Sequence, residues 1–282
     1  MDASEDLIAY CGLEAPCLAR AGEFLSDGAR RADAETFRAR YLGPNAPGGT
    51  PAAPAPDALE ASGLLQLAAV LRALPDARLA YRALGWPEAA LRETLSDVGI
   101  WARHHFRNYG CWGLAWIGTT WIARQLRAEV VRLGRLQCEL EREHAGRPVI
   151  GLHIPEDGPL DPAACRRSFG RMVEFFARHR PGYAYVGATC ESWFLDPQLE
   201  SVMGPDSNMV RFRQWGEPYA CGEPSDAVFR VFGVKAVAEG VDAVPHATRL
   251  QRALAEFLRR GGVPRTGGIF IPRPAFERLA LP

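Results

Sequence analysis

His153 is the residue whose type and position point most directly to chemistry. It lies at the end of residues 148–154, which predict a strand, and a side chain at a strand end can project into a cleft. A histidine imidazole titrates near neutral pH, so it can act as a general base with little adjustment by its surroundings. The other interpretation of His153 is a buried histidine that hydrogen-bonds to the backbone.

Three further candidates are consecutive in residues 183–193, which also predict a strand. Side chains alternate along a strand, so Cys190 and Ser192 face one side and Glu191 faces the other. Cys190 can serve as a nucleophile if His153 lowers the pKa of its thiol, or it can be a buried small apolar residue. Glu191 is an alternative base, or a residue that faces solvent.

The first half of the chain predicts helices separated by Pro and Gly. Apolar residues recur there at three- and four-residue spacing, which places them on one helical face. These segments are residues 18–25, 32–41, 59–74, 78–84 and 87–105. Residues 43–57, rich in Pro, Gly and Ala, predict a mobile loop. We therefore expect an all-helical domain over residues 1–129.

The second half predicts a mixture of strands and helices. The expected strands are residues 130–140, 148–154, 183–193 and 227–232, with a final edge strand at 268–271. The expected helices are residues 161–179, which Asp161 and Pro162 open, two short helices that begin at Asp196 and Ser207, and residues 246–260. This order predicts an α+β domain over residues 130–282, with a mixed sheet and flanking helices.

Composition excludes several classes of function. Lys and Arg total 33 and Asp and Glu total 33, so no net charge draws the chain to nucleic acid. The single lysine, Lys235, is not in a Gly-Lys-Ser/Thr loop, which argues against P-loop and pyridoxal enzymes. The signatures G-x-G-x-x-G after a strand, G-x-S-x-G and H-E-x-x-H are absent.

The cysteines and the apolar segments indicate the compartment. The seven cysteines are scattered without C-x-x-C spacing, so we expect reduced thiols and no metal site. The first ten residues lack the basic-then-apolar pattern of a signal peptide, and the apolar residues 111–123 are too few to span a bilayer. We expect a cytoplasmic protein that does not bind membranes.

Several segments together resemble one known family. They include Asp97-Val98-Gly99-Ile100-Trp101, Gly113-Leu114, Leu133-Gly134-Arg135-Leu136-Gln137, Leu152-His153-Ile154-Pro155, Cys190-Glu191-Ser192-Trp193-Phe194-Leu195-Asp196-Pro197 and Ser207-Asn208-Met209-Val210-Arg211-Phe212. Over residues 60–235 the chain resembles the two-part bacterial acyltransferases, in which a helical N-terminal domain precedes a GNAT-like N-acetyltransferase domain. The resemblance implies acyl transfer from an acyl thioester to an amine.

The resemblance also implies where the donor binds. In a GNAT-like fold the helix at residues 161–179 holds the coenzyme A pyrophosphate at its N-terminus, and Arg166 and Arg167 in its second turn can contact phosphate. The Arg/Gln-x-x-Gly-x-Gly/Ala loop typical of the fold is absent. An acyl carrier protein is therefore an alternative donor to coenzyme A.

Other residues have one structural and one functional interpretation each. Ser192 or Cys190 can protonate the departing thiolate. Ser207 and Asn208 either cap a helix or hold a substrate carboxylate or the thioester oxygen. Trp193 either packs in the core or lines a pocket.

The sequence as a whole predicts an acyltransferase that acylates a small-molecule amine directly, with His153 as general base. Two alternatives stay open: a double displacement through an acylated Cys190, and a binding protein that retains the fold without catalysis. The acyl group, the acceptor and the oligomeric state are not fixed by the sequence.

Overall fold

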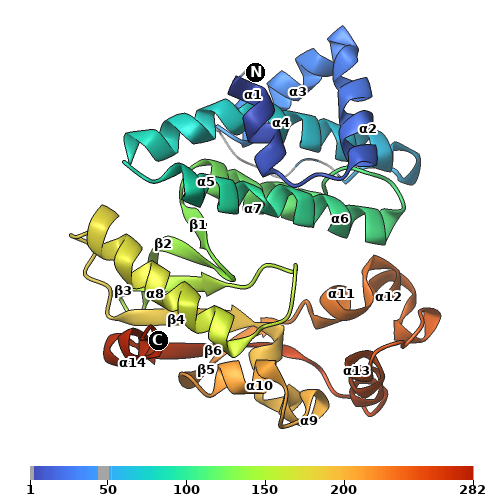
Figure 1. The fold of residues 1–282 in the computed structure, drawn as a ribbon. Coiled ribbons are helices and arrows are strands. Elements are labelled where there is room, and N and C mark those ends of the chain that lie inside the picture. The colour runs from blue at the N-terminus through green and yellow to red at the C-terminus, as the bar shows by residue number, and fades with distance from the viewer. Residues whose placement is uncertain (1–2, 44–50, 52, 282) are drawn as a thin grey trace. The chain divides into compact units, whose positions relative to one another are not determined.

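The computed structural model describes residues 3–43, 51 and 53–281 (Figure 1). The chain forms two compact units. Unit 1 comprises Met1–Leu133 and Pro155–Asp157, and unit 2 comprises Gly134–Ile154 and Gly158–Pro282. The boundary expected between residues 129 and 130 stays a prediction.

Unit 1 is helical among its described residues up to residue 129, apart from the connecting turns. Its helices are α1 (Ala3–Tyr10), α2 (Ala15–Ser26), α3 (Gly28–Tyr41), η1 (Pro56–Ala58), α4 (Leu59–Ala83), α5 (Glu88–Leu95), α6 (Asp97–Tyr109) and α7 (Trp116–Leu126). Asp27 caps α3 by accepting hydrogen bonds from the backbone N–H groups of Ala29 and Arg30. Most of the loop predicted at residues 43–57 lies outside the described residues.

Two helix boundaries differ from the predicted ones. Residues 59–74 and 78–84 belong to one helix, α4, which contains Pro75. A proline inside a helix removes one backbone hydrogen bond, but the buried face of α4 continues past it through Ala77 and Tyr81. The segment 87–105, expected as one helix, is divided at Ser96 into α5 and α6.

Unit 2 is built on five strands of a mixed sheet in the order β2-β3-β4-β6-β5, and β1 ends the first segment of unit 1. The strands are β1 (Val130–Leu133), β2 (Leu136–His144), β3 (Arg147–His153), β4 (Gly187–Ser192), β5 (Glu217–Pro224) and β6 (Arg265–Pro272). Strands β3 and β4 are parallel, whereas β2 with β3, β4 with β6 and β5 with β6 are antiparallel. The expected α+β architecture is confirmed.

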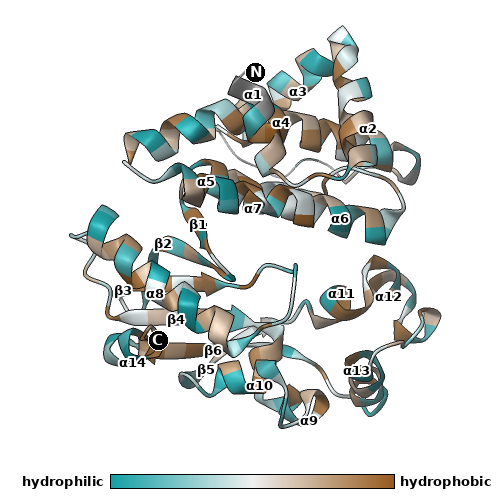
Figure 2. Ribbon diagram, in the orientation of Figure 1, coloured by the Kyte–Doolittle hydropathy of each residue, from teal (hydrophilic) through white to brown (hydrophobic). Residues whose placement is uncertain are grey.

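Helices flank this sheet. They are α8 (Pro162–His179), η2 (Trp193–Leu195), η3 (Pro197–Leu199), α9 (Glu200–Met203), α10 (Asn208–Arg213), α11 (Ala227–Phe232), α12 (Val234–Glu239), η4 (Val241–Ala243), α13 (Arg249–Arg259) and α14 (Arg273–Leu279). Helix α8 is amphipathic, with hydrophilic and hydrophobic residues interleaved along it (Figure 2). Its buried face includes Phe169, whose ring lies 4.8 Å from that of Phe276 in α14.

Two of the predicted strands differ in the structure. Residues 130–140 form two strands, because the chain turns at Gly134, which has a positive φ. Residues 227–232 form helix α11 rather than a strand: Ser225 accepts a hydrogen bond from the N–H of Ala227, and Arg230 pairs with Asp226 one turn earlier. These local contacts favour a helix over the strand that Val and Phe suggest.

The last strand is not an edge strand. Strand β6 pairs with β4 on one side and with β5 on the other. Strand β5 was not predicted. A Cβ added at Gly267 would lie 2.2 Å from the carbonyl oxygen of Leu195, so glycine at this position allows the neighbouring backbone to approach closely.

Candidate active site

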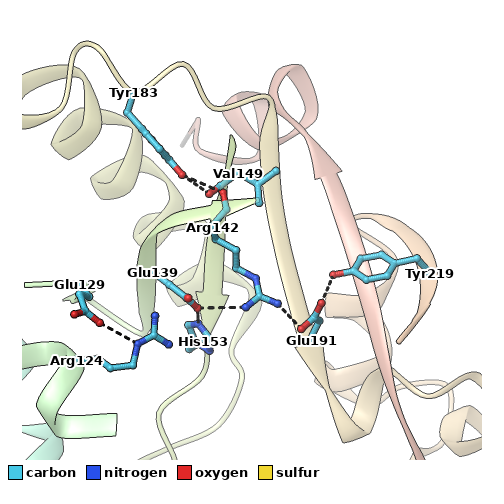
Figure 3. Close-up of polar contacts among 9 residues, drawn as sticks. All are labelled: Arg124, Glu129, Glu139, Arg142, Val149, His153, Tyr183, Glu191 and Tyr219. Atoms are coloured by element: carbon cyan, nitrogen blue, oxygen red, sulfur yellow. Dashed lines mark hydrogen bonds and ion pairs between the residues drawn. The ribbon is translucent and has the colours of Figure 1, made fainter. Parts of the chain in front are cut away.

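His153 ends strand β3, and its ring contacts a carboxylate. Its Nε2 lies 2.7 Å from Oε2 of Glu139 in β2 (Figure 3). The antiparallel register pairs Gln137 with His153 and Glu139 with Gly151, so Glu139 and His153 share one face of the sheet. The side chain of Glu139 is 10% exposed and that of His153 is 27% exposed. The carboxylate is therefore enclosed, while the imidazole stays accessible to a substrate.

Glu191 lies on the same face as His153. The parallel register pairs Gly151 with Thr189, and Glu191 follows two residues later. Its carboxylate accepts a hydrogen bond from the hydroxyl of Tyr219 in β5, at 3.0 Å, and another from Arg142 in β2 (Figure 3). The prediction that Glu191 faces away from Cys190 agrees with this geometry, although Glu191 is hydrogen-bonded rather than only solvated.

The ring of Tyr219 lies against a glycine, where a larger residue would not fit. A Cβ added at Gly268, its partner in β6, would lie 2.4 Å from the ring of Tyr219. Burial raises the pKa of the Tyr219 hydroxyl, and the negative charge of Glu191 raises it further. The phenol therefore stays protonated near neutral pH and acts as a hydrogen-bond donor.

Cys190 lies on the opposite face from His153. It pairs with Leu152 in β3, and Leu152 pairs in turn with Cys138 in β2. All three side chains are buried, and burial raises the pKa of Cys190 to about 12. This corrects the idea that His153 lowers the pKa of Cys190: alternation on paired strands separates the two side chains, and desolvation disfavours the thiolate.

The two residues after Glu191 end the strand. Ser192 pairs with Gly267 of β6 and is the last residue of β4. By alternation it shares the side of Cys190 rather than that of His153. Trp193 begins η2, and its ring lies 5.9 Å from that of the buried Phe194. Their roles in protonating a thiolate and lining a pocket stay predictions.

The predicted phosphate site at the start of α8 is partly occupied by the chain itself. Asp161 caps the helix and accepts a hydrogen bond of 2.7 Å from the N–H of Ala164. Pro162 has no N–H to offer, which leaves fewer amides for an anion. Arg166 and Arg167 are exposed, and the Arg166 guanidinium lies 6.0 Å from the ring of Trp215. Both arginines are accessible to phosphate, and their role stays a prediction.

Ser207 caps a helix, which is one of the two roles predicted for it. Its hydroxyl accepts a hydrogen bond of 3.2 Å from the N–H of Met209, which caps α10. Asn208 is the first residue of that helix, and both side chains are partly exposed. Contact of these two residues with substrate stays a prediction.

Sequence reasoning missed Arg142 and Tyr219 of this site, and it also missed Glu139. The only signal for it is a carboxylate at a strand position between Cys138 and Leu140, which are both apolar.

Among the described residues, no group of three or more His, Cys, Asp and Glu side chains could hold a metal ion. In the same part of the chain, no helix combines the length and apolarity that crossing a membrane requires.

Comparison with known families places this site in context. A family model described as the N-acyltransferase N-terminal domain matches residues 11–128, and one described as the GNAT-like C-terminal domain matches residues 130–270. The second model alone covers half of the chain. The chain belongs to the N-acyltransferases with a GNAT-like C-terminal domain. This confirms the resemblance inferred from the sequence.

Solved structures of acyltransferases resemble this N-acyltransferase along most of its length. One is an acyltransferase mutant in complex with octanoyl-CoA, at 28% identity and a TM-score of 0.79. Another is an acyltransferase in complex with decanoyl-CoA and teicoplanin, at 28% identity and a TM-score of 0.80. Each match covers 96% of this chain and 88% of the other. No curated protein matches the chain. The protein is therefore an acyltransferase.

Proposed function

We propose that the protein transfers an acyl group from an acyl-coenzyme A thioester to an amine of a small molecule, with His153 as general base. The observation that carries the proposal is the 2.7 Å contact between Nε2 of His153 and Glu139. Paired residues of β3 and β4 end at Leu152 and Cys190, so His153 lies past the last pair. A GNAT-like fold admits its thioester where these two strands separate.

The contact with Glu139 selects the atom that acts as base. A carboxylate accepts hydrogen bonds, so neutral His153 donates its Nε2–H to Glu139 and keeps the lone pair on Nδ1. Nδ1 is then the atom that receives a proton. Glu139 also stabilises the imidazolium that forms, as a carboxylate does wherever it orients a catalytic histidine.

The reaction balances with this one base. The acceptor ammonium gives a proton to Nδ1 of His153, and the free amine attacks the thioester carbonyl carbon. A C–N bond forms and the C–S bond breaks. The nitrogen loses a second proton as the amide forms, so one proton ends on the coenzyme A sulfur and the other reaches solvent. No covalent enzyme intermediate is needed, which agrees with the position of Cys190 on the other face.

The charges around His153 suit a cationic acceptor. Glu139 and Glu191 are carboxylates and Arg142 is a guanidinium, so these three side chains together carry one net negative charge. Such a charge attracts an ammonium ion and favours its approach over that of an anion. The related acyltransferases crystallised with acyl-CoA and teicoplanin support a thioester donor and a small-molecule acceptor for this chain as well.

The test uses decanoyl-CoA as donor, with teicoplanin and simple primary amines as acceptors, and measures thiol release and product mass. A saturating thioester stabilises the fold by about 2.7 kcal/mol and raises the midpoint of thermal unfolding by about 5 to 10 °C. We expect His153→Ala to keep this shift and to lose acyl transfer by about 100- to 10,000-fold.

The control is His179→Ala, which changes a histidine in the last turn of α8 and leaves His153 and Glu139 in place. We expect it to retain transfer. Absence of a thermal shift with decanoyl-CoA would overturn the coenzyme A donor, and a carrier-protein thioester would be tested next. Transfer that survives His153→Ala would overturn the role of His153. A thermal shift without transfer to any amine would favour the binding protein.

A further inference from the structure

A bulge in β2 determines which residue lies beside Glu139. The register of β2 and β3 shifts between Glu139 and Arg142, and Glu141 has a φ of 59°. Regular alternation would place Glu141 on the face of Glu139 and Arg142 on the opposite face. The extra residue of the bulge instead pairs Arg142 with Val149 and brings Arg142 onto the face of Glu139.

Two features hold this arrangement. The hydroxyl of Tyr183 donates a hydrogen bond of 2.7 Å to the carbonyl oxygen of Val149 and lies 3.4 Å from that of Arg142, at the bulge (Figure 3). Gly151 leaves the space: a Cβ there would lie 2.9 Å from Cδ of Arg142 and 3.0 Å from Cβ of Glu139. The bulge and Gly151 therefore leave room for the side chain of Arg142 to contact Glu139.

Arg142 lies between two carboxylates. Its Nη1 is 3.6 Å from Oε2 of Glu139, the same oxygen that contacts His153, and its Nη2 donates a hydrogen bond to Glu191 (Figure 3). Burial lowers the pKa of Arg142, but the two carboxylates outweigh this and leave the pKa raised. Arg142 is therefore a permanent positive charge within this group.

The positive charge of Arg142 affects the protonation of the His153 imidazole. The carboxylate of Glu139, which contacts His153, favours the imidazolium, and the positive charge of Arg142 beside that carboxylate opposes it. An imidazolium cannot accept a proton from the substrate. Arg142 thus disfavours the imidazolium and at the same time contacts the carboxylate that orients the ring.

We propose that Arg142 is a positioning residue, which holds Glu139 against His153 and keeps the imidazole in its neutral, proton-accepting form. This rests on the proposed function of His153. Other titratable or charged side chains on this face include Tyr219 of β5, which stays protonated, and His144 of β2, whose ring lies 4.6 Å from that of Tyr219. By strand register they also include Glu217 and Cys221 of β5 and Arg147 of β3.

The experiment is an NMR titration of the His153 imidazole in the full-length protein, with the signal assigned by its loss in His153→Gln. In Arg142→Gln we expect the titration midpoint to rise by about half to one pH unit, because the removed positive charge opposed protonation. Arg142→Lys keeps the charge and should return the midpoint toward that of the wild type. Glu191→Gln removes a negative charge and should lower the midpoint.

Arg180→Gln is the matched control. Arg180 pairs with Glu141 of the same bulge, and its side chain is 28% exposed, close to the 30% of Arg142. We expect this variant to titrate as the wild type does. A midpoint for Arg142→Gln within about 0.2 pH units of the wild type would overturn the proposal. If Arg142→Gln does not fold, Arg142→Met, which removes the charge and keeps a long side chain, is titrated in its place, and an unmoved midpoint there would overturn the proposal equally.

Turnover separates this proposal from the proposed function. With decanoyl-CoA and an amine acceptor, the acid limb of the kcat/KM profile should move to higher pH in Arg142→Gln, by the same amount as the NMR midpoint. Loss of turnover in His153→Gln together with an unmoved NMR midpoint in Arg142→Gln would leave His153 as base and reject the role of Arg142. Turnover that survives His153→Gln would reject the base, whatever the midpoint does.

Discussion

The two faces of the unit 2 sheet are made by alternate residues of the same strands, and around His153 they differ in charge. One face carries Cys138, Leu152 and Cys190, which are buried and contain no charge. The other carries Glu139, His153 and, after the bulge, Arg142, which contact one another. A single strand can thus supply core packing and a reactive group at neighbouring positions, because side chains alternate.

The comparison separates residues that the sequence places side by side. Cys190 and Glu191 are adjacent, yet one thiol is desolvated and the next carboxylate accepts hydrogen bonds from Arg142 and Tyr219. Which face carries the chemistry then depends on which face a helix covers. Helix α8 buries Phe169 and Cys165. A thiolate at Cys165 would raise the pKa of Cys190, so α8 lies near the face of the sheet that carries Cys190. We infer that the polar face is the one that meets substrate.

The largest expected effect on the polar face, after removal of His153 itself, comes from Glu139→Gln. The amide still fits the space but cannot stabilise an imidazolium, and it can bond either tautomer of the ring. We expect kcat to fall about 100-fold with little change in KM, measured by thiol release from decanoyl-CoA. A rate equal to that of the wild type would show that Glu139 does not act on the base.

A smaller effect is expected from Gly268→Ala. The added Cβ would overlap the ring of Tyr219 at 2.4 Å, so the phenol must move away from Glu191. We expect kcat to fall about tenfold, because Tyr219 and Glu191 lose their fixed positions while His153 is retained. The matched control is Gly158→Ala, where an added Cβ meets nothing within 4 Å. Equal rates in the two variants would indicate that the position of Tyr219 is immaterial.

On the apolar face, Cys190→Ala should change stability rather than rate. Removal of one buried sulfur costs about 1 kcal/mol and lowers the midpoint of thermal unfolding by about 2 to 4 °C. We expect acyl transfer to stay within about threefold of the wild type. A loss of rate as large as that of His153→Ala would move the chemistry to the other face.

The smallest effect is expected in alkylation of Cys190. Its pKa is raised to about 12, so the reactive thiolate forms only in strongly alkaline solution and the thiol stays protonated at pH 8. We expect iodoacetamide to leave Cys190 unmodified in the folded protein at pH 8 and to modify it after unfolding, as read by peptide mass spectrometry. Rapid alkylation of the folded protein would contradict the desolvated environment.

The fold could be predicted where the signal is local. Asp161 and Pro162 predicted the start of α8, and side-chain alternation correctly predicted that Cys190 and Glu191 lie on opposite faces of the sheet. Residues 227–232 were misjudged because local capping by Ser225 outweighs the strand preference of Val and Phe. The position of β6 inside the sheet depends on pairing with strands that are distant in the sequence, which no local sequence pattern indicates.

The site shows the same division. The position of His153 at a strand end follows from its own segment. Its contact with Glu139 depends on the register of two strands, and the contact of Arg142 depends on a bulge that shifts the alternation by one residue. Sequence reasoning also grouped His153 with Cys190, because it had no means of telling which residues of β3 and β4 lie opposite each other.

The most direct measurement compares kcat/KM for His153→Ala and Cys190→Ala side by side, with decanoyl-CoA and one amine acceptor, and records the mass of the intact protein during turnover. Direct transfer on the polar face predicts a loss of about 100- to 10,000-fold in His153→Ala, a change within about threefold in Cys190→Ala, and no acylated protein. A larger loss in Cys190→Ala, or a decanoyl group on Cys190, would contradict it.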